Sequence, residues 1–223
     1  LTTSEDPLGR KTEFKYGPLN QPIEQKDPEG DTFKYNYDIN GNITQLQTSG
    51  GTILNLARDL EGRVLSVGDS EGGTRHFKYD LSGNLIEEKD ANGNTWKFGV
   101  NSLDRLVSIT DPQSRAYAFG WDAGGNLINE TDRAGNTWNY TWSSDGKLKS
   151  IADAAGKVTA YTYNALGHLM EIAGALGGIT RIEYDSTGLI KSWIDPENRK
   201  TIYSHDDSGR LASITDPGGN ATA

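Results

Sequence analysis

The sequence predicts an all-β protein: an antiparallel meander of about 20 short strands, curled into a spiral or tube-like β-shell. Three observations lead to this prediction. Ten segments of 21 residues follow one another from Asp6 without insertion or deletion, each contains two turn segments that match D-x-x-G or are degenerate copies of it, and the aromatic residues recur with a spacing of two. A fixed period of about 20 to 50 residues is typical of arrays of supersecondary units.

The repeats begin at residues 6, 27, 48, 69, 90, 111, 132, 153, 174 and 195. We number the columns of the repeat from the Asp of D-x-x-G, so that Asp90 stands in column 1 and Gly93 in column 4. A gapless array leaves no linker at which the chain would divide. We therefore expect a single repeat array over residues 1–223, forming a fragment of a longer shell.

The first element of each repeat is a turn in columns 1 to 4. Asp at the first position, Pro tolerated at the second and Gly at the fourth are the preferences of a type I turn. Gly then adopts the left-handed conformation of a hairpin bulge without steric cost. Degenerate copies at the expected positions are predicted to fold in the same way: Thr48 to Gly51, Asp111 to Ser114, Gly174 to Gly177 and Asp195 to Asn198.

The second element is a strand with aromatic residues in columns 7, 9 and 11. All 20 aromatic residues except Trp193 fall in these three columns. A spacing of two places the rings on one face of an extended strand. Columns 8 and 10 carry mainly small or polar residues, which indicates a half-buried strand.

A second turn in columns 12 to 15 and a second strand from column 17 complete the repeat. Asp80 to Gly83 is one such turn, and Leu85 and Leu169 open two of the second strands. A hairpin over this turn pairs column 11 with column 17, whereas the next hairpin pairs column 20 with column 7. Columns 17 and 20 differ in parity, so we predict a β-bulge near columns 17 and 18. Open sheets rarely exceed about 10 strands without curling, which favours a rolled sheet.

Composition excludes several classes of function. The net charge of −9 argues against nucleic acid as a partner, because that affinity depends on clustered Lys and Arg. No apolar stretch is long enough to predict a membrane span. The absence of Cys excludes a disulfide framework and thiolate chemistry.

The repeat resembles a known family. Tyr79-Asp80-Leu81-Ser82-Gly83-Asn84-Leu85, with its counterpart from Tyr163 to Leu169, is similar to the RHS or YD repeat, Y-D-x-x-G-R-L followed by D-x-x-G. The resemblance covers essentially the whole chain. It implies a hollow β-shell, which in bacterial polymorphic toxins and insecticidal toxin complexes encloses a toxic C-terminal domain, and which in animal teneurins serves cell-surface adhesion. The family's D-P-x-G-L self-cleavage signature is not carried over, because Arg10 follows the Asp6 to Gly9 motif and the motifs at Asp27, Asp195 and Asp216 also lack the following Leu.

We expect no catalytic residue, metal site or cofactor. Turn geometry accounts for the recurrence of Asp, and the three histidines, His76, His168 and His205, fall in different columns without a shared metal-ligand spacing. Calcium would require a nonapeptide repeat that is absent. The predicted structural residues of the motif are Tyr79, Asp80, Gly83, Leu85, Asp90, Gly93, Tyr163, Gly167 and Leu169.

The aromatic residues leave one alternative open. Trp96, Trp121, Trp138 and Trp142 fall in three consecutive repeats, in columns that share a face. The rings either cover the hydrophobic face of the sheet or form a strip on which glycans stack.

Three functional hypotheses follow. The first, implied by the resemblance, is a non-enzymatic shell segment of a secreted or cell-surface bacterial protein, whose partner is a toxin domain or another part of the shell. The second is an adhesion module that binds a cell-surface glycan or protein. The third is self-association through exposed strand edges.

Overall fold

The computed structural model describes residues 2–222 and is built entirely from strands and turns over that range. Its 22 strands are β1 Thr2–Glu5, β2 Lys11–Tyr16, β3 Pro22–Lys26, β4 Thr32–Tyr37, β5 Ile43–Thr48, β6 Ile53–Arg58, β7 Val64–Asp69, β8 Thr74–Tyr79, β9 Leu85–Lys89, β10 Thr95–Val100, β11 Leu106–Thr110, β12 Ala116–Trp121, β13 Leu127–Thr131, β14 Thr137–Trp142, β15 Leu148–Ala152, β16 Val158–Tyr163, β17 Leu169–Ala173, β18 Ile179–Tyr184, β19 Ile190–Ile194, β20 Lys200–His205, β21 Leu211–Thr215 and β22 Ala221–Thr222. The predicted all-β meander is confirmed.

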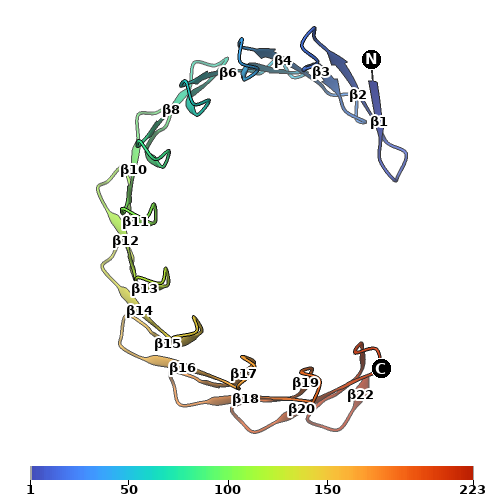
Figure 1. The fold of residues 1–223 in the computed structure, drawn as a ribbon, viewed down its shortest axis with the longest axis vertical. Coiled ribbons are helices and arrows are strands. Elements are labelled where there is room, and N and C mark those ends of the chain that lie inside the picture. Colours follow the sequence, from blue (N-terminus) through green and yellow to red (C-terminus); the bar gives the residue numbers. More distant parts are fainter. Residues whose placement is uncertain (1, 223) are drawn as a thin grey trace. The chain divides into compact units, whose positions relative to one another are not determined.

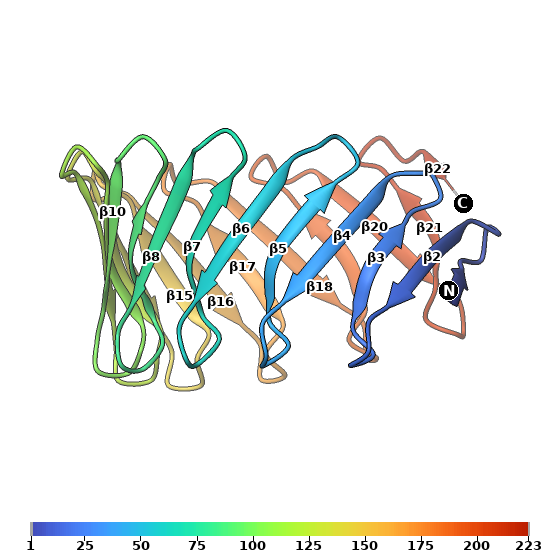
Figure 2. The ribbon, with the colours of Figure 1, turned by 90° about the horizontal axis from the view of Figure 1, so that it is seen from above.

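The chain divides into two compact units, one ending at Ala116 and the other beginning at Tyr117. In each unit, consecutive strands pair antiparallel, and the turns form two rows at opposite ends of the strands (Figure 2). The ribbon of each unit curves along its length (Figure 1). The repeat period continues through the division, and the prediction of a single domain stays a prediction.

The predicted β-bulge occurs in every repeat. In the fourth repeat, Lys78 lies opposite Glu87 and Tyr79 opposite Leu85, so Ile86 in column 18 is the extra residue. In the eighth repeat, Tyr163 lies opposite Leu169, and Met170 is extra. The register shift falls at the same column in all ten hairpins. The parity argument therefore predicted a real irregularity, of the kind that bends and twists a strand.

The sheet is a single layer with almost no buried core. Among the described residues, Ile182 is the one buried hydrophobic side chain, with 4% of its surface exposed. Most strand residues are half-buried, because neighbours on the same face cover their sides while the face itself stays uncovered. Cross-strand neighbours therefore supply the packing that a second layer supplies in other folds.

Candidate functional site

The five-residue turn is the element that the sequence repeats most faithfully. In the turn that begins at Asp90, the Gly93 N–H donates to the Asp90 carbonyl at 3.0 Å, and the Asp90 N–H donates to the Asn94 carbonyl at 2.9 Å. Gly93 has a φ of +87°. The same pair of backbone bonds closes every turn of both rows, so the predicted type I turn with a left-handed residue is confirmed.

Four degenerate copies adopt this geometry with another residue in place of the fourth-position glycine. Asp104, Ser114, Asn198 and Asn20 occupy the fourth position with φ values of +57°, +63°, +59° and +59°. The Ser114 N–H still donates to the Asp111 carbonyl at 2.9 Å. The array therefore imposes the left-handed conformation even on residues that adopt it at a cost.

The aspartate side chain organises its own turn. Asp90 Oδ1 accepts hydrogen bonds from the N–H groups of Asn92 and Asn94 at 2.9 and 2.8 Å, and Oδ2 accepts one from Asn94 Nδ2 at 2.8 Å. The side-chain bond from Asn94 is the main reason why the pKa of Asp90 lies below its usual range. Asp is thus present as the anion that accepts these bonds.

The fifth residue of the turn, which is the R of the Y-D-x-x-G-R-L signature, has a hydrogen-bonding role that the sequence analysis did not predict. Its side chain donates to the turn aspartate at eleven positions: Arg10, Asn42, Arg63, Asn84, Asn94, Arg115, Asn126, Asn136, Arg199, Arg210 and Asn220. The signal was present in the sequence, because Arg or Asn follows D-x-x-G in most copies.

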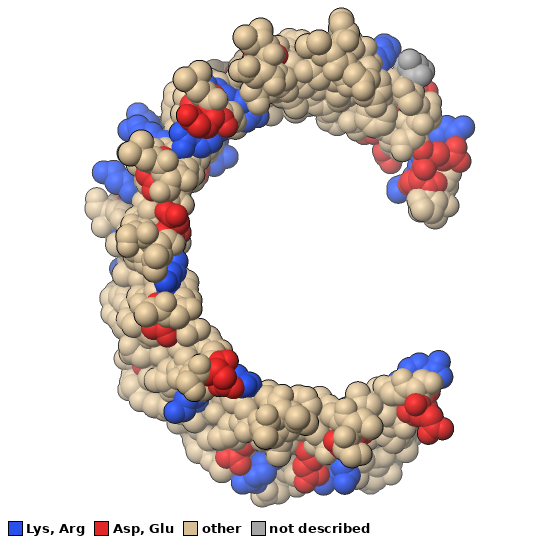
Figure 3. Space-filling view, viewed as in Figure 1, with Lys and Arg blue, Asp and Glu red and all other residues tan. Residues whose placement is uncertain are grey.

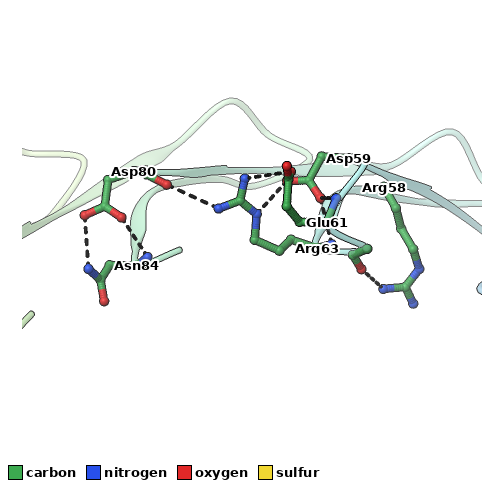
Figure 4. A network of polar contacts seen from close by, with 7 residues as sticks. Arg58, Asp59, Glu61, Arg63, Asp80 and Asn84 are labelled. Atoms are coloured by element: carbon green, nitrogen blue, oxygen red, sulfur yellow. Dashed lines mark hydrogen bonds and ion pairs between the residues drawn. The ribbon is translucent and has the colours of Figure 1, made fainter. Parts of the chain in front are cut away.

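Column 16 also connects one turn with the next. Arg63 Nε donates to Asp59 Oδ2 in its own turn at 2.6 Å, while Nη1 donates to the carbonyl of Asp80 in the following turn at 3.2 Å (Figure 4). The Arg63 guanidinium lies 5.2 Å from the ring centroid of Tyr79. One side chain therefore joins two repeats through a hydrogen bond and a cation–π contact.

Other residues occupy column 16 in the same way. Asn84 Nδ2 reaches Asp104 Oδ1 of the next turn at 2.7 Å, and the ring of His168 lies 4.7 Å from that of Tyr184. A Cβ added to Gly188 would lie only 2.9 Å from His168 Cε1. Gly188 is thus covered by the preceding repeat in addition to having a positive φ, whereas Gly146 in the same column has no atom within 4 Å of an added Cβ.

The side chain of column 11 ties several repeats to the bulge before them. Tyr163 Oη donates to the Leu148 carbonyl and Tyr184 Oη to the Leu169 carbonyl, both at 2.9 Å. Each acceptor is the column 17 residue at which the bulged strand opens. Tyr37, Trp142 and Arg58 reach the equivalent carbonyls of Pro22, Leu127 and Ile43. The predicted aromatic column therefore has a polar function that its spacing did not reveal.

The opposite face carries polar cross-strand pairs. Asn36 Nδ2 donates to Gln45 Oε1, and Gln45 Nε2 donates to Asn55 Oδ1, in a row across three strands. The Lys78 ammonium lies 2.7 Å from Glu87 Oε1 and holds the pKa of that carboxyl below its usual range. The two faces therefore differ in chemistry, as predicted from columns 8 and 10.

The four tryptophans are half-buried and do not form one cluster within a unit. Trp96 belongs to the first unit, opposite Glu88, whereas Trp121, Trp138 and Trp142 lie on β12 and β14 of the second unit. Trp142 Nε1 is already bonded to the Leu127 carbonyl at 2.7 Å. The glycan-stacking role stays a prediction.

The described residues provide no obvious site for chemistry. Among them, no group of three or more His, Cys, Asp or Glu side chains is arranged to hold a metal ion. No helix in residues 2–222 is long and apolar enough to span a bilayer. The conspicuous arrangement is instead the network of turns and rings that joins consecutive repeats.

The repeat network agrees with the family comparisons. A model described as Teneurin YD-shell matches residues 8–142, and the RHS Repeat model matches residues 142–179 and 184–221. The chain belongs to the RHS/YD-repeat shell family. Membership in this family supports a structural role as a segment of a shell. No curated protein matches the chain.

Solved structures show the same fold at low identity. The chain aligns with the crystal structure of TcdB2-TccC3-TEV at 16% identity and a TM-score of 0.71, covering 96% of this chain and 13% of that one. It aligns with the Photorhabdus luminescens Tc holotoxin pore at 16% identity and a TM-score of 0.54, covering 93% and 14%. It aligns with the crystal structure of TcdB2-TccC3 at 15% identity and a TM-score of 0.54, covering 96% of this chain and 15% of that one. The chain thus spans about one seventh of the length of these proteins.

Proposed function

We propose that this RHS/YD-repeat chain forms part of the wall of a hollow container that encloses a toxin domain of the same or an associated polypeptide. The observation that carries the proposal is the single-layer ribbon, in which each repeat is fastened to the next and neither face is covered by a second layer. A wall needs continuity along its length and two accessible surfaces. A binding pocket or a packed core would require different architecture.

The structural relatives support a toxin as the cargo. Two of them are described as TcdB2-TccC3 complexes and one as a Tc holotoxin pore. We extend this association to the present chain, and with it a secreted or bacterial cell-surface location. The role is non-enzymatic for this segment, because its recurring aspartates are used within their own turns.

Protease protection in the natural full-length protein tests the proposal. We expect the region outside the repeats to resist digestion while the shell is intact, and to be cleaved when Tyr163→Phe and Tyr184→Phe remove two ties between repeats. Tyr161→Phe is the matched control, because column 9 pairs with Ile172 rather than with the bulge. Equal cleavage of that region in the wild type and in the double variant would contradict enclosure.

A second candidate, glycan binding, is favoured by the three tryptophans of the second unit. Trp121, Trp138 and Trp142 lie in columns 7 and 11 of adjacent hairpins, which share a face. Sugar rings can stack on such side chains only where the faces of the aromatic rings are exposed. A glycan array with clear hits that Trp121→Ala and Trp138→Ala abolish, with the circular dichroism spectrum unchanged, would establish this function. An array without hits would remove it.

A further inference from the structure

The polar face of the first unit carries every lysine of that unit. We define this face by columns 6, 8, 10, 19 and 21, whose residues lie opposite one another from strand to strand. Its lysines are Lys11, Lys15, Lys26, Lys34, Lys78, Lys89 and Lys97, and its acidic residues are Glu5, Glu13, Glu24 and Glu87. The face is therefore basic, although the chain as a whole has a net charge of −9.

Five positions of this face recur as an identical group three repeats apart. The first group is Lys15, Glu24, Lys26, Thr32 and Lys34, and the second is Lys78, Glu87, Lys89, Thr95 and Lys97. In the second group, Lys97 lies opposite Glu87, and Lys89 lies opposite Thr95, across β9 and β10. The first group has the same pairing across β3 and β4. We call these two sets the lysine groups.

The fold does not require the lysine groups. In the second unit, one repeat has Thr141, Ser150, Ala152, Val158 and Ala160 in the same five columns, and its strands pair in the same register. Within the first unit, the repeat that follows the first group has Asn36, Gln45, Gln47, Ile53 and Asn55 there. The lysines are therefore additions to a scaffold that folds without them.

In each group, one lysine is paired with the central glutamate and two are not. Lys15 donates to Glu24 in the first group, and Lys78 lies 2.7 Å from Glu87 in the second. The bond from Lys15 is the main cause that lowers the pKa of Glu24, and the charge of Lys34 adds to it. Among residues 2–222, the exposed lysines of the two groups without a hydrogen bond or ion pair are Lys26, Lys34, Lys89 and Lys97.

The two unpaired lysines of a group lie on either side of a threonine hydroxyl. Thr95 lies opposite Lys89 and two residues before Lys97 on β10. Diagonal neighbours on adjacent strands are about 7 to 8 Å apart, so both ammonium groups and the hydroxyl can donate to one carboxylate. Beside the first group, a hollow of about 430 Å³ that Thr32 and Lys34 help to line leaves room for such a group.

The spacing of the groups favours a ligand that contacts both. One group alone should bind a carboxylate weakly, because exposed ion pairs contribute little. The groups are six strands apart, which is about 29 Å along the sheet. A ligand that spans this distance makes its second contact at a high effective concentration. Figure 3 shows Lys and Arg side chains around β8 to β10 and near the N-terminal strands, with few charged side chains between them over β4 to β6.

We propose that the polar face of the first unit binds an extended acidic peptide segment of a partner protein. Its carboxylates lie on the two lysine groups, about nine residues apart at the rise of an extended chain. Between the groups, the amides of Asn36, Gln45 and Asn55 form a row that both donates and accepts hydrogen bonds, as peptide groups do. This interaction is independent of the shell function proposed above, because it uses only the first unit.

Other polyanions fit this face less well. A nucleic acid or a sulfated polysaccharide is charged along its whole length, and its central charges would lie over the uncharged row of Asn36, Gln45 and Asn55. The aromatic residues of the first unit all stand in columns 7, 9 and 11, on the opposite face. Unpaired bases would therefore find no ring on which to stack.

Fluorescence anisotropy with two labelled peptide rulers tests the proposal. Each ruler has a Glu-Glu pair at both ends and prolines between them. Because a polyproline II helix rises about 3.1 Å per residue, roughly eight prolines span the two lysine groups and roughly two do not. We expect the long ruler to bind the chain at least about tenfold more tightly than the short one, since only the long ruler contacts both groups.

Two double variants locate the binding. Lys26→Ala with Lys34→Ala disables one lysine group and should reduce the affinity of the long ruler to that of the short one. The matched control, Lys149→Ala with Lys157→Ala, removes two exposed lysines of the second unit and should leave the affinity unchanged. Because all four side chains are exposed, circular dichroism should show both variants folded.

Three results would each overturn the proposal. The first is equal binding of the two rulers. The second is a long ruler that binds equally to the chain and to the variant with Lys26→Ala and Lys34→Ala, or that is weakened equally by both double variants. The third is tighter binding of heparin or of a single-stranded oligonucleotide than of the long ruler, which would exclude a peptide as the preferred occupant.

Discussion

The two rims of the ribbon are built from the same turn but are fastened differently. On the column 12 rim, the row of turns in columns 12 to 15, a Cβ added to the column 15 glycine would in most cases lie within 4 Å of the column 16 side chain of the preceding repeat, as for Gly188 and His168, with Gly146 as an exception. On the column 1 rim, the row of turns in columns 1 to 4, several glycines have no side chain or backbone atom within 4 Å of an added Cβ, and Gly135 is one of them. The glycine of the motif is therefore required by its positive φ alone at these turns of the column 1 rim, and by its positive φ and the side chain above it at the covered turns of the column 12 rim.

Valine substitutions at these glycines should give the largest effect and separate the two causes. Both residues have a positive φ, +90° for Gly188 and +87° for Gly135, so Val should cost about 2 kcal/mol of the free energy of unfolding at either position. Gly188→Val should lose roughly 1 kcal/mol more, because its Cβ would overlap the His168 ring.

Urea denaturation measures both losses. Thr162→Ala, in column 10 on the polar face, serves as the control and should change stability by less than about 0.5 kcal/mol. Equal losses for the two valine variants would show that the cover from the preceding repeat has no energetic weight.

Most of the fold could be predicted from the sequence, but the contacts that distinguish the two rims could not. The strands, turns and bulges were predictable because they depend on residues a few positions apart, such as Tyr79, Asp80 and Gly83. The contact of Arg63 with Asp80 joins residues of adjacent repeats. The sequence did not indicate this contact, because each residue already has a role within its own turn. The hydroxyl bond of Tyr163 depends on where the bulge directs the Leu148 carbonyl, which a column pattern does not specify.

Removal of the turn carboxylate should cost the same stability on both rims. Asp80 on the column 12 rim and Asp90 on the column 1 rim accept equivalent bonds from Asn84 and Asn94. Asp80→Ala and Asp90→Ala should therefore each cost about 1 kcal/mol, comparable with the loss of a helix N-cap. Asn at either position keeps one acceptor oxygen and should cost less. Clearly unequal costs in thermal denaturation would show that the carboxylate also acts between repeats on one rim.

The opposite change, from a side chain to glycine, should stabilise the column 1 rim. Ser114 has a φ of +63° and Asn198 a φ of +59° in the fourth position of their turns. Ser114→Gly relieves left-handed strain and should add up to about 1 kcal/mol, whereas Asn198→Gly should add less, because Asn tolerates this conformation better. Ala134→Gly, at a turn position without a positive φ, is the matched control and should not stabilise. A gain at Ala134 as large as that at Ser114 would contradict the explanation.

The response to acid should be the smallest effect for each turn. Hydrogen bonds, chiefly from the side chains of Asn84 and Asn94, hold the pKa values of Asp80 and Asp90 below their usual range. A carboxyl with a lowered folded-state pKa contributes stability that is present above its unfolded pKa, about 3.9, and is lost as the pH falls through the folded value. Thermal stability should therefore decline below about pH 4.

An amide variant isolates this contribution. Asp90→Asn removes one titrating carboxyl and should make the decline below about pH 4 shallower. In contrast, Thr48→Ser changes a turn that lacks the carboxylate, so it should leave the slope of the decline in thermal stability unchanged. A slope unaffected by Asp90→Asn would show that the acid response arises elsewhere.

The bond from column 11 side chains such as Tyr163 and Tyr184 to the preceding bulge makes these repeats a chain of nearest-neighbour links. Tyr184 holds the repeat of Leu169, and Tyr163 holds the repeat of Leu148, with no step that skips a repeat. In a linear system of this kind, stability grows by a constant increment with each added unit, and disorder spreads from a break outward. Such a polymer can be lengthened by duplication of 21 residues at a time, with each new copy supplying both the tie to its predecessor and the carbonyl for its successor.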